Sequence, residues 1–438
     1  MLPSRNGTKP PADISSKRAN ESRIVSSFPD ESEAGAFVQT ILLEAAEDLE
    51  PQSHPEYDAQ FDEGPSWGGP SPRISAAAGL TLMARLESCA TQTILQAVEQ
   101  LSSDPVPAVR FQVAERLICL YYTAPDLMWA LLERLSHSEE SRGVLQGMLT
   151  GTLTRIARSH PDRIVELARA IFNRITQGAG ADLVRTACVS IFVQFYLLQD
   201  HPVCHEIVFA LADDPGQFAN ENWSMAANLR EALTYGSIAQ PNLEHEALRF
   251  RAWALMERIL RSTHAATLKL LSQNTSTPLA EDEQKRLRGL ARLVDSMGHD
   301  LYAASGASDA KHIRSVEEKK RFLSEAGPLL DELTEFNYPS LIHRLLEMFD
   351  FLAPVDPPSV FLRIGRIVLT GRQNGYQYES FGADLIIRIV ERYLAEFRGV
   401  LRENGEYRRI LIEILDIFVK VGWPQARQLT YRMEEIFR

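Results

Sequence analysis

The helical period of the apolar residues limits the fold of this chain more than any other feature. From Pro72 onward, apolar side chains recur every three to four positions in blocks of roughly 12–20 residues, and strand-like alternation is almost absent. In residues 105–121, for example, the apolar positions are Val109, Val113, Leu117 and Leu120. Pro, Gly, Asp or Ser bounds each block within a few residues, so the connections are short and neighbouring helices are expected to be antiparallel. The pattern predicts an all-α fold.

Breaker residues divide the chain into three predicted regions. Residues 1–71 form an N-terminal region: about the first 30 residues have no periodicity and are expected to be disordered, and one short helix follows around Phe37, Ile41 and Leu42. A linker rich in Pro and Gly then spans 51–70. Residues 72–305 are predicted to be helical repeats. Residues 306–438 are predicted to be a helical C-terminal block, with a soft boundary near Gly306.

The N-terminal region carries an unusual run of acidic residues. Between Glu31 and Glu63 there are ten acidic residues and no Lys or Arg. Two interpretations remain open, a solvated tether and an acidic arm that docks on a basic surface, including a surface of this protein itself.

Composition excludes several classes of protein. The net charge of −12 argues against a general nucleic-acid coat, which needs an excess of Lys and Arg. The first 25 residues contain no apolar signal segment, and the most apolar stretch, Val189–Leu198, is broken by Gln194 and short for a membrane span. We therefore expect a cytoplasmic protein without a membrane partner. Its cysteines lack CxxC pairing and are expected to be buried free thiols; they are Cys89, Cys119, Cys188 and Cys204.

An internal repeat points to a known architecture. The segment 104–117, with Asp104, Pro105, Val109-Arg110, Ala114 and Leu117, resembles the first helix of a HEAT repeat. Weaker matches to the same pattern occur at Arg73, Arg142 and Arg185, and the spacings between these arginines suit a repeat of helix pairs. The resemblance covers roughly 72–235 and implies an α-solenoid of antiparallel HEAT-like, or armadillo-like, helix pairs. It also implies a ladder between repeats, for which only Asp104 and Arg110 match both positions.

The sequence favours a protein without catalytic residues, cofactor or metal. It contains no Gly-Lys dipeptide and no GxGxxG, HExxH or GxSxG pattern. Two His-Glu dipeptides, His205-Glu206 and His245-Glu246, resemble the iron-binding motifs of deoxyhypusine hydroxylases, which are HEAT-like proteins with four such motifs. Two dipeptides are too few for a di-iron site, so we interpret them as residues of solvated helix faces.

Two groups of residues are candidates for partner binding. The first is basic and begins with Arg249, Arg251, Arg258 and Arg261 on one long predicted helix. It continues with Lys285, Arg286, Arg288, Arg292, Lys311, Arg314, Lys319, Lys320 and Arg321. These side chains either are solvated and balanced by nearby acids, or line a surface that binds phosphate or an acidic peptide.

The second candidate group lies in the loop 371–381. Its side chains Arg372, Asn374, Tyr376 and Tyr378 combine large contact area with polar groups, as recognition loops do. In the alternative interpretation, the tyrosines pack back on the flanking helices.

Together these features predict a non-catalytic scaffold or adaptor that binds another protein through its concave face and C-terminal helices. Two alternatives remain. One is a nucleic-acid-binding protein that uses the arginine-rich helices of 249–321. The other is a sensor or regulatory subunit of a larger bacterial ATPase machine, because the C-terminal block resembles the helical tails of large bacterial ATPases, some of which act in phage defence.

Overall fold

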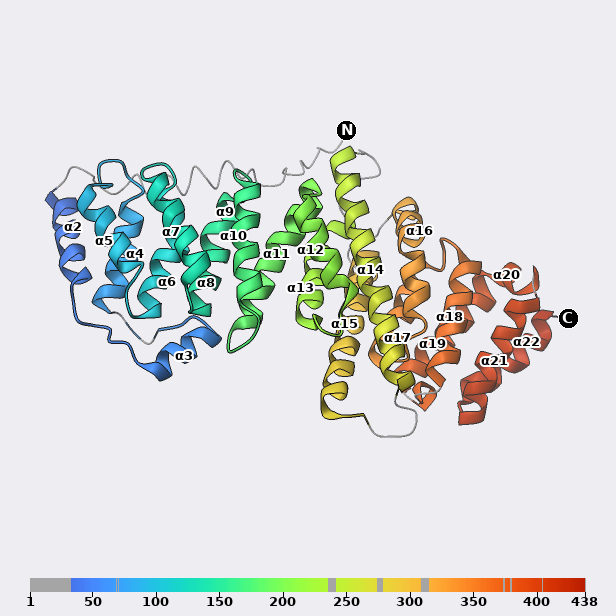
Figure 1. Cartoon of the computed structure of the whole chain (residues 1–438). Helices are drawn as coiled ribbons and strands as arrows, with labels where there is room; N and C mark the ends of the chain where they lie inside the picture. The colour runs from blue at the N-terminus through green and yellow to red at the C-terminus, as the bar shows by residue number, and fades with distance from the viewer. Residues whose placement is uncertain are drawn as a thin grey trace, which may run out of the picture. The chain divides into compact units, whose positions relative to one another are not determined.

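The computed structural model is built of helices packed on helices (Figure 1). It describes residues 33–67, 69, 71–234, 242–273, 279–308, 315–372, 375–378, 380–403 and 405–437. Over these residues no strand occurs, which confirms the all-α prediction. The arrangement of neighbouring helices is compatible with a helical repeat.

The chain divides into two compact units, an N-terminal unit of residues 1–188 and a C-terminal unit of residues 189–438. The division falls inside the helix α11 (Ala181–Gln199). The sequence-based boundary near Gly306 instead coincides with a helix end, where Gly306 caps its helix with a φ of 85°. Only glycine adopts such a conformation at little cost. A domain boundary at this position stays a prediction.

In the N-terminal unit, a helix packs against the helix two places further along the chain. The bounds are α2 (Glu33–Ala46), α3 (Pro55–Glu63), α4 (Pro72–Met83), α5 (Gln92–Leu101), α6 (Pro107–Arg116), η1 (Leu117–Leu120), α7 (Pro125–Ser138), α8 (Arg142–Gly147), η2 (Met148–Leu153), α9 (Thr154–Ile156) and α10 (Pro161–Arg174). Helix α2 packs on α4, α4 on α6, and α6 on both α8 and η2. Helix α7 packs on α10 in the same way.

Three glycines of the continuous helical segment 142–156, which consists of α8, the π-helical η2 and α9, lie against neighbouring helices, two against α6 and one against α3. A Cβ atom on Gly147 would lie 2.4 Å from Cε2 of Phe111, and one on Gly151 would lie 2.5 Å from the carbonyl oxygen of Glu115. Gly143 faces Phe61 of α3 equally closely. Because the three glycines are four residues apart, they share one helix face. Their missing side chains let the helices approach closely.

Two of the helices lie in the region that the sequence assigned to a tether and a linker. Helix α2 packs on α4, and α3 occupies part of the breaker-rich segment 51–70. Pro55 stands in the first turn of α3, where a missing N–H group costs nothing. The prediction of a single short helix in residues 1–71 is therefore incomplete, because the same proline that breaks one helix can begin another.

The C-terminal unit repeats the next-but-one packing. Its helices are α12 (Pro202–Asp213), α13 (Ala219–Leu229), η3 (Ala232–Thr234), α14 (Leu243–Gln273), α15 (Glu281–Ser305), α16 (Val316–Leu333), α17 (Pro339–Leu352), α18 (Pro357–Gly371), η5 (Tyr376–Tyr378), α19 (Ser380–Glu396), α20 (Arg398–Glu403), α21 (Gly405–Val421) and α22 (Pro424–Phe437). Contacts join α12 to α14, α13 to α15, α14 to α16, and α15 to α17. Helix α18 packs on α21, and α21 packs on α22.

Helix α11 is the one helix in the described part of the chain that is long and apolar enough to cross a membrane. At 19 residues it is longer than the apolar stretch noted in the sequence. Within its most apolar window, 61% of the residues are buried inside the protein. Such burial is typical of the core helix of a soluble protein.

Candidate functional site

The tyrosines of the predicted recognition loop lie in opposite environments. Tyr376 is 2% exposed, and its hydroxyl lies 3.4 Å from Nδ1 of His343 on α17. Its ring lies so close to Gly382 that a Cβ atom there would be 2.5 Å away. Tyr378 is 70% exposed, and Arg372 is exposed as well. Asn374 lies outside the described residues. The structure therefore leaves Tyr378 and Arg372 exposed to solvent and places Tyr376 in the core.

The four arginines of α14 all have partners within the chain. Arg249 is 6% exposed and forms ion pairs with Glu246 at 2.5 Å and Glu325 at 3.1 Å. Arg251 donates from Nε and Nη2 to the carbonyl oxygen of Leu197, at 2.8 and 2.5 Å. Each side chain thus links α14 to another helix.

Arg258 and Arg261 are paired but more exposed. Arg258 forms an ion pair with Asp213 of α12, and Arg261 forms one with Glu257, one turn earlier on α14, at 2.5 Å. The side chains of Arg258 and Arg261 keep 52% and 63% of their surface exposed. A role for these two arginines in partner binding stays a prediction.

The remaining basic residues separate into two groups. Lys285, Arg286, Arg288 and Arg292 stand on α15 and are exposed, and Arg292 lies over the ring of Trp223 at 5.2 Å. On α16, Arg321 pairs with Glu246, and the Nζ of Lys319 lies 3.6 Å above the ring of Phe351. Lys311 and Arg314 lie outside the described residues.

Ion pairs of one kind recur along the C-terminal unit and account for many of its arginines. Each joins a helix to its next-but-one neighbour, and we call the set the zipper pairs. They are Asp213–Arg258, Arg230–Asp300, Glu246–Arg321, Asp295–Arg344, Asp331–Arg363 and Asp350–Arg392. Most of these side chains are partly exposed, so each pair contributes about 0–1 kcal/mol, and their regular placement favours one register of helices.

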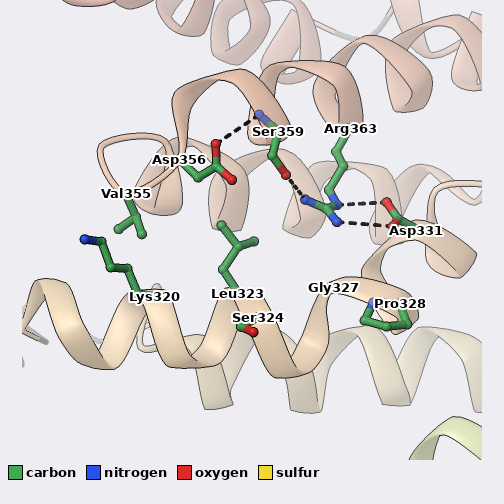
Figure 2. A pocket seen from close by; sticks show the side chains of 10 residues that line it. All are labelled: Lys320, Leu323, Ser324, Gly327, Pro328, Asp331, Val355, Asp356, Ser359 and Arg363. Carbon is green, nitrogen blue, oxygen red and sulfur yellow. Dashed lines mark hydrogen bonds and ion pairs between the residues drawn. The ribbon is translucent and has the colours of Figure 1, made fainter.

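A polar groove lies between α16 and α18 (Figure 2). Its volume is about 530 Å³. Arg363 spans it and donates to both carboxylate oxygens of Asp331, at 2.8 and 3.1 Å, and to the hydroxyl of Ser359. Asp356 caps α18 by accepting from the N–H of Ser359 at 3.3 Å. Most polar groups of the groove therefore already have partners.

The α16 side of this groove is shaped by Gly327 and Pro328. A Cβ atom on Gly327 would lie 3.4 Å from Nη2 of Arg363, so the guanidinium group packs directly over this glycine. Pro328 stands inside α16, and because it has no N–H it leaves the carbonyl of Ser324 without its helical hydrogen bond. Lys320 is exposed at the same groove.

An apolar groove of about 430 Å³ lies on α21 and α22. It is lined by Leu415, Val419 and Met433, and Ile412 and Tyr431 beside them are 49% and 74% exposed. Asp416 and Arg427 add one charge of each sign. Large exposed apolar side chains that surround a groove are typical of a protein-binding surface. Periodicity placed apolar residues on both helices, but it could not show which of them stay uncovered.

Residues of the two His-Glu dipeptides contact other side chains of the protein. His205 bonds Asp200 at 2.9 Å and stacks on Phe209, while Glu246 accepts from Arg321. Over the described residues, no three His, Cys, Asp or Glu side chains come close enough to hold a metal ion. The four cysteines are buried and unpaired. Burial raises the pKa of the Cys204 thiol to about 12, so that thiol is unreactive at neutral pH.

Two buried ion pairs lie around the position where the sequence predicts a ladder, and we call these two pairs the ladder. Asp104 forms an ion pair with Arg73 of α4, in which Nε of Arg73 lies 2.9 Å from Oδ2 of Asp104. Arg110 donates two hydrogen bonds of 2.8 Å to the carboxylate of Glu139. Glu139 also accepts from the backbone N–H of Ser141 at 2.8 Å. The sequence did not indicate Glu139, because six residues before Arg142, where Asp104 stands relative to Arg110, the chain has Ser136.

Comparisons with known proteins add no identification. No protein-family model matches the chain, and no curated protein matches it.

Proposed function

We propose that this protein is a non-catalytic helical-repeat scaffold, an α-solenoid of antiparallel HEAT-like helix pairs, that binds another protein through its C-terminal helices. The apolar groove on α21 and α22 is the observation that carries the proposal. The next-but-one packing of helices in both units supports the repeat architecture, because helix pairs stacked in a row produce such contacts.

The shape and chemistry of the groove favour an amphipathic helix of the partner as its occupant. A helix can place three or four apolar side chains along one face, and Leu415, Val419 and Met433 offer an apolar floor for them. Ile412 and Tyr431 border this floor as large exposed side chains. Arg427 has no ion-pair partner among the described residues, so an acidic residue on the polar side of the partner helix would complement it.

Two exposed side chains extend the proposed surface beyond the groove. Tyr378 and Arg372 precede α19, and α19 packs on α22. Aromatic and arginine side chains are enriched in protein interfaces because they combine large area with hydrogen-bonding groups.

The test is capture of partners from native lysate by the full chain and by two matched variants. Ile412→Asp with Tyr431→Asp places charge at the apolar groove, whereas Tyr122→Asp changes a residue of the N-terminal unit that is 88% exposed. We expect one protein to be captured by the parent chain and by Tyr122→Asp, and lost from the double variant at unchanged thermal stability. Equal capture by all three chains would refute the role of the groove.

A nucleic-acid-binding function makes a different prediction in the same experiment. The exposed basic residues of α15 are its best candidates, because the α14 arginines are occupied by partners in the chain. Captured nucleic acid that is released by salt and lost in Lys285→Glu with Arg286→Glu would favour this alternative over the scaffold.

A further inference from the structure

Helix α3 rests on the N-terminal unit through very few side chains. It lies against α6 and α8, as Figure 1 shows, and Phe61 is its one buried side chain among the nine residues of the helix. A helix of this length is unstable by itself in water. Burial of a single phenylalanine stabilises the docked helix only modestly. The contact is therefore specific but weak.

The surface that receives Phe61 is a shaped socket. A Cβ atom on Gly143 would lie 2.5 Å from Cε1 of Phe61, so the missing side chain of Gly143 makes room for the ring. Phe111 of α6 meets the Phe61 ring edge-on, at a centroid distance of 5.7 Å. Trp67, which follows α3, contacts the same Phe111 ring at 5.7 Å. Two aromatic residues of the N-terminal region thus hold one phenylalanine of the helical array.

Asp62 adds a polar contact at the edge of this socket. Its Oδ1 atom accepts from the hydroxyl of Ser141 at 2.5 Å and from the backbone N–H of Gly143 at 3.2 Å. These groups begin the helical segment 142–156, where the helix dipole favours negative charge. The socket therefore recognises an aromatic side chain followed by a carboxylate.

Other residues of the acidic arm lie near two arginines of the same unit, Arg73 and Arg110. Arg73 donates to the carbonyl oxygens of Asp48 and Pro51, at 2.8 and 2.6 Å. Asp58 lies within electrostatic range of Arg110. Of the two interpretations of the acidic run, this geometry favours the arm that docks on its own chain, since the Asp62 carboxylate and the backbone carbonyls of Asp48 and Pro51 accept hydrogen bonds from the helical array.

We propose that α3 is a releasable strap, and that the socket it occupies binds an acidic segment of another protein in which an aromatic residue precedes an aspartate. In the free protein, Phe61 and Asp62 fill the socket from within the chain. A partner segment of the same chemistry competes with them and displaces α3. This interaction is independent of the groove on α21 and α22.

The test is binding of a labelled peptide to full-length protein with an empty socket. The peptide carries residues 51–67 of this chain, and the protein carries Phe61→Ala with Asp62→Ala. We expect the peptide to bind this variant at least tenfold more tightly than the parent chain, in which the strap competes. A control peptide with both substitutions should bind neither protein. Equal binding to parent and variant, or no binding to a variant with native circular dichroism, would overturn the proposal.

Hydrogen exchange tests the strap without any substitution. The amides of α3 should exchange at least a hundredfold faster than those of α6, because release of α3 exposes only one large apolar side chain. Equal protection of the two helices would show that α3 is a fixed part of the core, and this measurement decides the matter if the double variant does not fold.

Discussion

The two units use the same type of ion pair in opposite ways. In the N-terminal unit, an arginine on an earlier helix reaches an acidic residue in the loop before a later one, as in Arg73–Asp104 and Arg110–Glu139, and both acids are buried. In the C-terminal unit, most zipper pairs have the acid on the earlier helix and the arginine on the later one, and the acids are partly exposed. The buried pairs also bind backbone N–H groups, so they position loops as well as helices.

This difference implies unequal energetic roles for similar-looking charges. A buried pair that loses one partner leaves the other charge without compensation, at a cost of about 3–5 kcal/mol. A solvated pair that loses one partner costs about 0–1 kcal/mol, because water replaces the missing group. The buried ladder should therefore be essential to the N-terminal unit, whereas each zipper pair should be individually dispensable.

The largest expected effect follows removal of the acid at the centre of the ladder. Glu139→Ala leaves Arg110 without its carboxylate partner and the N–H of Ser141 without an acceptor, in a site where the side chain of Glu139 is 4% exposed, so we expect a loss of about 3–5 kcal/mol. The matched change is Asp331→Ala, whose side chain is 46% exposed, with an expected loss of about 1 kcal/mol or less. Urea unfolding measures both, and equal losses would remove the distinction between the two units.

The next effect concerns the glycine face of segment 142–156. Gly147→Ala places a methyl group 2.4 Å from the ring of Phe111, and we expect a destabilisation of about 1–3 kcal/mol from overpacking. Gly405→Ala is the control, because Gly405 begins α21 with open space around its Cβ position. The control should leave the unfolding midpoint unchanged or raise it. If Phe111→Leu in the Gly147→Ala background restores no stability, the Phe111 ring is not the cause of the loss.

The sequence predicted the all-α fold and singled out Arg110, but it did not identify the acidic residue with which Arg110 pairs. Periodicity is a local property, so it located most helices, and Asp104 with Arg110 marked one position of the ladder. The partner acid of a given arginine stands 29 residues away in Arg110–Glu139 and 75 residues away in Glu246–Arg321. Only the fold brings such residues together. An arginine-rich helix in the sequence is therefore weak evidence for a basic surface.

The candidate site was less predictable than the fold for the same reason. Tyr376 and Tyr378 stand two residues apart in one loop, yet one is buried and the other exposed. No periodicity exists in a loop to distinguish them. The glycines of segment 142–156, in contrast, were detectable, because three glycines at four-residue spacing in a helix predict a close contact along one face.

The smallest expected effect concerns Arg230–Asp300, whose polarity is opposite to that of the other zipper pairs. The arginine stands at the end of α13 and the acid on α15, and the Asp300 side chain is 0% exposed while Arg230 remains 47% exposed. Burial raises the pKa of Asp300 above its usual value, and the hydrogen bond from Arg230 offsets this only in part. The carboxylate Oδ2 has no hydrogen-bond partner among the described residues.

A raised pKa in the folded state means that folding favours the protonated acid, so this contribution to stability is lost as the pH rises through the folded pKa. Asp300→Asn keeps the shape and removes the buried charge. We therefore expect its unfolding free energy, relative to that of the parent chain, to increase between about pH 4 and pH 7, as thermal unfolding at several pH values would measure. Asp295→Asn on the same helix removes a partly exposed partner of Arg344 and should instead lower stability slightly at pH 7. If Asp300→Asn lost stability relative to the parent as the pH rose, the pair with Arg230 would outweigh the burial, and Arg230–Asp300 would act like the buried ladder of the N-terminal unit.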